Sequence, residues 1–196
     1  MRIAVIGNIG AGKTTLVTKL AKKMGLNPLF EPVEKLMYLE KFYKEPDKYA
    51  FKLQLEMFVE KYTQLTEKTN KKNIISDRIL EESFFIFTEN LFEAGKISVN
   101  ERQILLQYYL ALNKNVPEFD KIIYINRDVD TLMSNINKRG RECENGIEKA
   151  YIESLNKLYN GYVNSVIKTM QGDSLIILDN FDCNNDIEID NLIKRL

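Results

Sequence analysis

The first group of residues with chemical potential lies close to the start of the chain. Residues 7–14 read G-N-I-G-A-G-K-T, between an apolar run at 3–6 and a helical apolar pattern from Leu16 to Met24. The glycines permit a turn whose amide groups point at phosphate oxygens, while Lys13 would reach the outer phosphates and the Thr14 hydroxyl would ligate Mg²⁺. The alternative is a glycine-rich turn without a ligand, and the flanking strand and helix patterns favour a P-loop. The expected phosphate-donor site is Gly7, Asn8, Ile9, Gly10, Ala11, Gly12, Lys13, Thr14 and Thr15.

Carboxylates and a guanidinium follow the next two apolar runs. Glu31 opens the segment Glu-Pro-Val, and Asp77 is followed directly by Arg78. A carboxylate near the last phosphate could accept the proton of an attacking hydroxyl, and Arg78 could hold that carboxylate and balance charge in the transition state. Two structural interpretations stay open: Glu31 could be an acid at a helix N-terminus, and Asp77-Arg78 could be a helix cap or a buried ion pair.

A cationic segment, Lys138-Arg139-Gly140-Arg141, ends a predicted helix and precedes a loop of polar residues. Arginines delivered by a closing loop stabilise a transferring phosphoryl group, so Arg139 and Arg141 are predicted to belong to a lid. The structural alternative is that these cations complement a helix C-terminus. A GTPase switch protein is disfavoured because the chain has no Asn-Lys-x-Asp segment for guanine.

These residues need a parallel sheet to bring them together, since ligands of open α/β sheets bind beyond the carboxyl ends of the strands. The pattern alternates short apolar runs with longer helical stretches, which predicts an α/β fold with a five-stranded parallel sheet. Expected strands lie at 3–6, 29–30, 74–75, 122–125 and 175–178. Expected helices lie at about 13–24, 35–44, 47–69, 79–95, 99–115, 129–138, 147–170 and 186–195.

Composition restricts the class of protein. A length of 196 residues predicts a single domain, 1–196. The 28 Lys and Arg balance 28 Asp and Glu, so the chain lacks the broad positive field of a nucleic-acid binder. No apolar run approaches the roughly 20 residues that cross a bilayer, so no membrane partner is expected. Cys143 and Cys183 have no metal or redox spacing, and the chain opens on its first strand rather than on a signal segment. We therefore expect a cytoplasmic protein.

Taken together, these motifs resemble the deoxynucleoside kinases. The motifs are G-N-I-G-A-G-K-T-T, E-P-V, the segment Tyr43 to Pro46, Gln54, D-R at 77–78 and R-G-R-x-x-E at 139–144. The resemblance spans nearly the whole chain and is strongest to the bacterial deoxyadenosine and deoxyguanosine kinases, which have Asp before the arginine. It implies a P-loop kinase fold with an arginine-bearing lid, with ATP and Mg²⁺ as cofactors.

The resemblance also implies roles for the catalytic residues. Glu31 matches the general base that approaches the substrate 5′-hydroxyl, and Arg78 matches the arginine that binds this hydroxyl and the carboxylate. Asp77 matches an acidic residue beside the metal that is sometimes assigned as the proton acceptor instead, so the choice between these two bases stays open. Thr14 and Asp77 are the expected metal ligands, and Lys13, Arg139 and Arg141 would balance the phosphoryl charge.

Four further residues match positions that bind the nucleoside. Tyr43 and Glu144 match the pair that hydrogen-bonds the sugar 3′-hydroxyl, and the tyrosine ring would crowd a ribose 2′-hydroxyl. Gln54 matches the amide that pairs with the base edge, and an amide can flip to meet either kind of edge. Phe87 matches the ring on which the base stacks. Without the resemblance, Gln54 reads as a polar helix position and Phe87 as core.

The chain departs from the family pattern at the base and at the lid. Many relatives pair an arginine and an aspartate at the positions of Lys61 and Ser83, and a Lys and a Ser cannot form that bidentate fork. Asn135 replaces an arginine one turn before R-G-R, although Lys138 could compensate, so a weaker lid is expected. Deoxyadenosine and deoxyguanosine are favoured as substrates, while broad or pyrimidine specificity stays open.

The predicted function is a deoxynucleoside 5′-kinase of nucleotide salvage. One alternative is a nucleoside monophosphate kinase of the thymidylate kinase type, but the unpaired carboxylate of Glu31 would repel an acceptor phosphate. A second alternative is a catalytically silent binding or assembly subunit with the kinase fold. The resemblance further implies inhibition by a deoxynucleoside triphosphate and a homodimer formed by the helices near 79–95 and 147–170. For the apolar run Phe84, Phe85, Phe87, Leu91 and Phe92, core packing is the stronger expectation.

Overall fold

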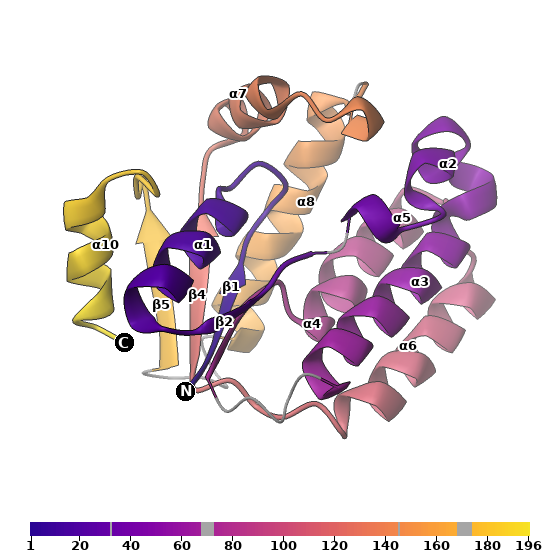
Figure 1. Cartoon of the computed structure of the whole chain (residues 1–196). Coiled ribbons are helices and arrows are strands. Elements are labelled where there is room, and N and C mark those ends of the chain that lie inside the picture. The colour runs from indigo at the N-terminus through magenta and orange to yellow at the C-terminus, as the bar shows by residue number, and fades with distance from the viewer. Residues whose placement is uncertain (32, 68–72, 145, 168–173) are drawn as a thin grey trace.

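A computed structural model describes residues 1–31, 33–67, 73–144, 146–167 and 174–196. Its centre is a parallel sheet with the strand order β2-β3-β1-β4-β5 (Figure 1). In register, Ala4 of β1 lies opposite Ser76 of β3 and Ile122 of β4. All carboxyl ends therefore meet at one edge. The strands are β1 (Arg2–Ile6), β2 (Asn27–Leu29), β3 (Ile74–Asp77), β4 (Lys121–Asn126) and β5 (Leu175–Asp179).

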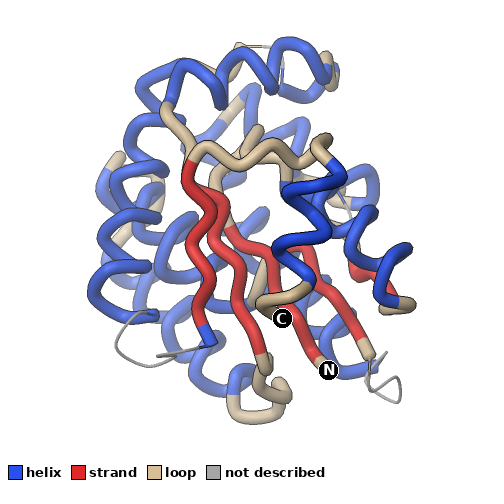
Figure 2. The backbone as a smooth tube through the Cα atoms, turned by 90° about the vertical axis from the view of Figure 1, so that its left-hand side faces the viewer, coloured by secondary structure: helices blue, strands red, loops and turns tan. Residues whose placement is uncertain are grey.

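Helices cover both faces of this sheet, so the strands run between two helical layers (Figure 2). Helices α1 and α10 form one layer, and the other contains α3, α4, α6 and α8 (Figure 1). Helix α7 lies across the carboxyl edge of the strands. The helices are α1 (Lys13–Met24), α2 (Leu39–Lys44), α3 (Pro46–Glu67), α4 (Leu80–Glu82), α5 (Glu89–Glu93), α6 (Val99–Asn113), α7 (Val129–Arg139), α8 (Lys149–Tyr162) and α10 (Asp186–Ile193), with short 3₁₀ or π segments η1 (Val33–Lys35), η2 (Ser83–Thr88), η3 (Glu142–Glu144) and η4 (Val163–Ile167).

Two apolar clusters hold the layers together. The first joins β1, β4 and β5 to α1, α8 and α10, and Leu16, Leu20 and Tyr159 lie within it. The second lies among β2, α3, η2 and α6, around residues such as Phe58 and Leu105. Strands buried on both faces read as continuous apolar runs, which is why Ile3–Ile6 and Ile122–Ile125 could be recognised from the sequence. The expected α/β architecture with five parallel strands is confirmed.

Most element boundaries agree with the expectation, and two regions differ. The second strand ends at Leu29, so Phe30 lies beyond it. The expected helix at 35–44 is broken, because the Glu56 carboxylate accepts hydrogen bonds from the amides of Met37 (2.7 Å) and Tyr38 (3.0 Å) and so starts a separate helix, α2. The ends of the helices expected at 47–69 and 147–170 fall partly outside the described residues.

The helix expected at 79–95 is continuous but has a π-helical centre, η2. There the Thr88 hydroxyl donates to the Ser83 carbonyl at 2.8 Å. Of the apolar run expected to pack in the core, Phe84, Phe87 and Leu91 are buried, whereas Phe85 and Phe92 are half-buried. No helix in the described part of the chain is long and apolar enough to cross a membrane.

Candidate active site

A cavity of about 730 Å³ opens at the carboxyl edge of the sheet. Its wall combines the loop after β1, the ends of β2 and β3, one face of α3, and the α7–η3 segment. Of the expected donor site, Gly7 and Asn8 do not line it. The expected site residues that do are Ile9, Gly10, Ala11, Gly12, Lys13, Thr14, Thr15, Glu31, Tyr43, Gln54, Asp77, Arg78, Phe87, Arg139, Arg141 and Glu144.

The loop between β1 and α1 has the backbone of a phosphate cradle. Gly10 and Gly12 have φ values of 79° and 99°, which L side chains rarely adopt. A Cβ on Gly10 would lie 2.6 Å from the Leu132 carbonyl oxygen, and one on Gly7 would lie 2.9 Å from that of Ile125. Glycine is therefore required at Gly7 and Gly10 by the close approach of neighbouring backbone, and at Gly10 and Gly12 by the positive φ angle.

Two asparagine side chains, one within the loop and one on α7, hold the backbone of this loop. The Asn8 side chain accepts from the Ile9 amide at 2.8 Å and donates to the Ile152 carbonyl of α8 at 3.0 Å. Asn135 of α7 donates to the Gly10 carbonyl at 2.8 Å. The expectation that Asn135 marks a weaker lid stays a prediction, and in this structure its amide contacts the phosphate loop.

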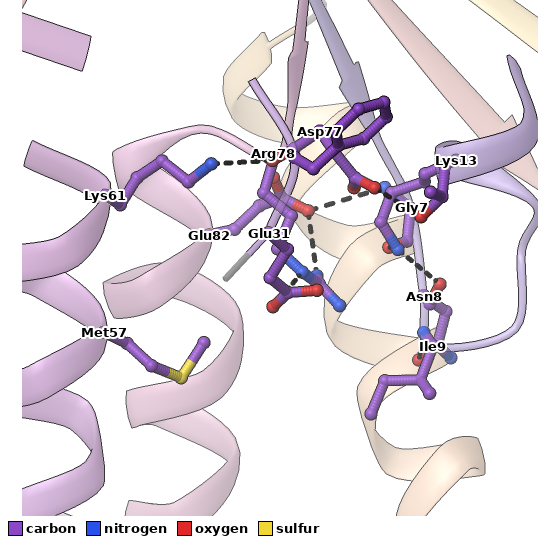
Figure 3. Close-up of polar contacts among 12 residues, drawn as sticks. Gly7, Asn8, Ile9, Lys13, Glu31, Met57, Lys61, Asp77, Arg78 and Glu82 are labelled. Atoms are coloured by element: carbon purple, nitrogen blue, oxygen red, sulfur yellow. Dashed lines mark hydrogen bonds and ion pairs between the residues drawn. The ribbon is translucent and has the colours of Figure 1, made fainter. Parts of the chain in front are cut away.

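Lys13 begins α1 and is buried beneath the loop. Its ammonium donates to the carbonyls of Gly7 at 2.8 Å and Asn8 at 2.9 Å (Figure 3). Burial, and then the nearby Arg78 guanidinium, lower the pKa of Lys13 to about 8. The cation is therefore held at low solvation, where a polyphosphate would stabilise it.

The two predicted metal ligands are in direct contact. The Thr14 hydroxyl donates to Asp77 Oδ2 at 2.7 Å, across the gap between α1 and the end of β3. Asp77 Oδ1 is buried without a hydrogen-bond partner in the described structure. A buried carboxylate oxygen with spare capacity beside a hydroxyl is the donor set that Mg²⁺ prefers.

Glu31 and Arg78, two further residues predicted to be catalytic, form an ion pair. Arg78 Nε donates to Glu31 Oε1 at 2.8 Å, and the guanidinium lies 4.6 Å from the centre of the Phe87 ring. Burial opposes the charge of Glu31, but Arg78 and Lys13 outweigh it and lower the pKa of this carboxyl to about 2. Glu31 is therefore a carboxylate at neutral pH. Glu31 and Asp77 have separate partners, one at Arg78 and one at Thr14.

Behind Arg78 lies a buried pair that the sequence analysis missed. Arg78 NH1 donates to the Tyr159 hydroxyl at 2.7 Å, and that hydroxyl donates to Glu82 Oε1 at 2.6 Å. Glu82 Oε2 accepts from the Ile79 amide at 2.8 Å. Burial raises the pKa of Glu82, while Arg78 lowers it. The signal for Glu82 was present, as a carboxylate one helical turn after Arg78, whereas nothing distinguished Tyr159 from other helix tyrosines.

In the predicted lid, the two arginines contact Glu144, the residue that is predicted to bind the sugar. Arg139 NH2 lies 2.5 and 2.6 Å from the two Glu144 carboxylate oxygens, and Arg141 NH1 lies 3.5 Å from one of them. Glu144 is buried, while about a third of each arginine side chain is exposed. The three residues form one unit on the cavity wall.

The residues predicted to bind the nucleoside also line the cavity: Gln54 from α3, Phe87 from η2 and Tyr43 from the end of α2. Gln54 is buried, and its Oε1 has no hydrogen-bond partner in the described structure. A buried amide oxygen without a partner needs one, so Gln54 is suited to a ligand. Lys61 and Ser83, which occupy the positions of the relatives' base-reading pair, do not line this cavity.

The family model for deoxynucleoside kinases matches residues 3–195. The chain belongs to the deoxynucleoside kinase family. Its relatives include deoxyguanosine kinase of Bacillus subtilis, 35% identical over 153 residues (78% of this chain, 73% of the relative), and deoxyadenosine kinase of Lactobacillus acidophilus, 28% identical over 209 residues (99% and 97%).

Solved kinase structures agree with this one over its whole length. Deoxyadenosine kinase of M. mycoides with bound dATP has a TM-score of 0.86 and 30% identity, covering 100% of this chain and 98% of that one. The same enzyme with dCMP and a flexible dCDP bound has a TM-score of 0.88 and 31% identity, with the same coverage. The predicted P-loop kinase fold and deoxynucleoside kinase function are thereby confirmed. The comparisons support neither the monophosphate kinase nor the silent subunit.

Proposed function

We propose that this kinase transfers the γ-phosphoryl group of ATP to the 5′-hydroxyl of a deoxynucleoside with Glu31 as the general base. The observation that carries this assignment is the separation of the two acids. Glu31 is bound to Arg78, whereas Asp77 is bound to the Thr14 hydroxyl. Asp77 is thus assigned to the metal side, and Glu31 remains to receive the proton.

In the proposed step, the 5′-oxygen forms a bond to the γ-phosphorus while its proton passes to a Glu31 carboxylate oxygen. The bond from the γ-phosphorus to the bridging oxygen breaks, and ADP leaves with that electron pair. Arg78 holds Glu31 and the hydroxyl in place, and Lys13 with the loop amides neutralises the donor phosphates. Arg139 and Arg141 would add charge from the lid, which requires them to exchange their contact with Glu144 for the phosphoryl group or the sugar.

Mg²⁺ fits the residues present. Thr14 and the unpartnered Asp77 Oδ1 would hold it, directly or through water, together with phosphate oxygens. When bound, the ion would neutralise charge on the β- and γ-phosphates. No group of three or more His, Cys, Asp or Glu side chains that could hold a metal ion occurs among the described residues. Phosphate oxygens and water would therefore supply most of the ligands of the ion.

For the acceptor, we propose that Tyr43 and Glu144 bind the sugar 3′-hydroxyl, that Gln54 pairs with the base and that Phe87 stacks on it. The relatives are named deoxyguanosine or deoxyadenosine kinases, which favours a purine deoxynucleoside. Gln54 alone does not choose between base edges, because its amide can present donor and acceptor in either order. Pyrimidine deoxynucleosides therefore belong in the same test.

The test is an initial-rate panel with Mg-ATP and the four deoxynucleosides, the matching ribonucleosides and the deoxynucleoside monophosphates. Phosphorylation of deoxyadenosine or deoxyguanosine in preference to the others supports the proposal, and preference for thymidine or deoxycytidine refutes the purine assignment. Reaction of monophosphates alone, or no reaction at all, refutes the proposed function itself.

We further propose a cytoplasmic homodimer, on the basis of the family resemblance. Sedimentation equilibrium tests the dimer, because one chain has a mass of 22.9 kDa. A species of twice that mass is expected at micromolar concentration, and a single species of chain mass would contradict it.

A further inference from the structure

Lys61 stands where many relatives have a base-reading arginine, yet its ammonium group points elsewhere. Lys61 lies on α3 with 5% of its surface exposed. Its Nζ donates to the backbone carbonyl of Asp77 at 2.7 Å and to Gln64 Oε1 at 3.1 Å (Figure 3). A lysine ammonium has three donors, so two of them are already used on the protein.

Lys61 does not line the cavity that contains Gln54, the residue proposed to pair with the base. Lys61 and Ser83 line a small void of about 20 Å³, whereas Gln54 lines the large cavity. Gln54 and Lys61 are seven residues apart on α3, which is roughly 10 Å along the helix axis. A void of this size holds about one water molecule and cannot admit a base.

The backbone that Lys61 contacts is strained. Arg78 has a φ of 73°, a left-handed conformation that is uncommon for a residue other than glycine. This turn sends the Asp77 side chain toward Thr14 and the Arg78 side chain toward Glu31. Backbone strain of this kind persists only where the surroundings hold it.

Three buried side chains hold this turn from different elements. Ser76 Oγ donates to the Arg78 carbonyl at 2.7 Å, and Glu82 accepts from the Ile79 amide at 2.8 Å. Lys61 supplies the third contact, at the Asp77 carbonyl, and it is the one that comes from α3. Burial lowers the pKa of Lys61, and the nearby Asp77, Glu31 and Glu82 carboxylates offset part of this cost.

We infer that Lys61 is a positioning residue for the Asp77–Arg78 turn and not a reader of the base. The inference rests on the proposed function, because it concerns the geometry of the groups assigned to catalysis. By fixing the Asp77 carbonyl from α3, Lys61 sets where the metal-side carboxylate and the Glu31-binding guanidinium point. Base choice then depends on Gln54 and the apolar wall around it.

The test compares K61M, K61Q and K61R with the wild type, and K52M is the matched control because Lys52 is an exposed lysine of the same helix. K61M should lower kcat by about 10- to 100-fold, since small misplacements of catalytic groups cost up to that factor. The dissociation constants of the four deoxynucleosides, measured by calorimetry, should change less than threefold and keep their order. K61R, which retains donors and charge, should recover at least part of kcat.

Two results would overturn the inference. One is a changed order of base affinities in K61M or K61Q with kcat retained, as expected of a base reader. The other is a kcat of K61M equal to that of K52M. If K61M does not fold, K61Q decides the question, because it keeps a donor for the Asp77 carbonyl without the charge. A wild type that phosphorylates no deoxynucleoside refutes the proposed function, whereas an active wild type with an unaffected K61M and K61Q refutes only this inference.

Discussion

At the scale of single residues, the site depends on which carboxylate contacts which partner. Glu31 and Asp77 are both near the phosphate loop, but one is paired with a guanidinium and the other with a hydroxyl. A pairing of this kind assigns different roles to chemically similar groups, because the charge of one is fixed by Arg78 and the other keeps a free oxygen for a cation.

Replacing Glu31 by Gln should leave the fold intact and lower kcat by at least ~100-fold, the usual size of a general-base contribution. Gln keeps the shape of the side chain and can still accept a hydrogen bond from Arg78, but it cannot take the proton. Steady-state kinetics with a deoxynucleoside measures the loss, and thermal unfolding checks the fold. A variant with wild-type turnover would remove Glu31 from the mechanism.

The pKa of Lys13 predicts how the affinity for the phosphate donor changes with pH. Its pKa of about 8 in the folded protein means that the ammonium loses its proton as the pH rises through 8. A bound triphosphate favours the charged form, so ATP affinity should weaken above pH 8, approaching roughly tenfold per pH unit while the bound form stays protonated. Calorimetric titration of ATP between pH 7 and about 9.5 measures this.

The control for this pH dependence is Lys13→Ala. That variant should bind ATP weakly at every pH and turn over slowly, and its affinity should not change between neutral and alkaline pH. A wild-type affinity that is flat across the same range would show that Lys13 does not carry the titrating charge.

At the scale of elements, helix α8 is connected to the Asp77–Arg78 turn by the hydroxyl of Tyr159. Tyr159 lies between Arg78 and Glu82, so a helix more than seventy residues later in the chain holds the arginine that binds Glu31. The same helix accepts a hydrogen bond from Asn8 of the phosphate loop. Helix α8 therefore contacts both the loop between β1 and α1 and the Arg78 side chain.

Replacing Tyr159 by Phe should lower the free energy of unfolding by about 1–3 kcal/mol, because it removes the short hydrogen bonds of the buried Arg78 NH1 and Glu82 Oε1 and leaves between these two atoms a longer contact at 3.4 Å. It should also lower kcat by about tenfold, because Arg78 loses a contact that orients it. Chemical denaturation and steady-state kinetics measure the two effects.

Tyr162 provides the matched control on the same helix. It is buried and stacks on Phe85, and its hydroxyl has no hydrogen bond to any residue within the described ranges. Tyr162→Phe should therefore change the free energy of unfolding and kcat little. Equal effects of the two substitutions would mean that Tyr159 contributes through packing and not through its hydroxyl.

At the scale of the whole molecule, the cavity is a junction between distant parts of the chain. Residues from Ile9 to Asn184 line it, and they come from both apolar clusters and from the lid. A ligand that fills this cavity would contact several elements at once. Binding should therefore stabilise the fold as a unit.

A deoxynucleoside at 100 times its dissociation constant should stabilise the protein by about 2.7 kcal/mol, which for a chain of this size raises Tm by roughly 5–10 °C. Differential scanning calorimetry without a phosphate donor measures this shift in the absence of turnover. The matching ribonucleoside at the same concentration is the control. It should bind more weakly and shift Tm less, because the Tyr43 ring is expected to crowd a 2′-hydroxyl. Equal shifts would contradict the proposed preference for deoxyribose.

The sequence by itself determined the parts of this protein that depend on local pattern. Continuous apolar runs predicted the buried strands, and glycine spacing predicted the loop between β1 and α1, because a parallel sheet and a phosphate cradle both impose constraints on adjacent residues. Glu31, Asp77 and Arg78 could be found because each lies at or just beyond the end of a strand, and carboxyl ends of parallel strands share one edge.

Tertiary structure alone decided which of these groups are partners. The separation of Glu31 from Asp77, the brace of Asn135 on Gly10 and the contact of Lys61 with the Asp77 carbonyl all join residues far apart in the chain. Tyr159 is the clearest case, since its role depends on where α8 packs. Local pattern encodes the conformation of a segment, but a hydrogen bond between distant segments depends on the packing of the layers, and no single stretch of sequence specifies that packing.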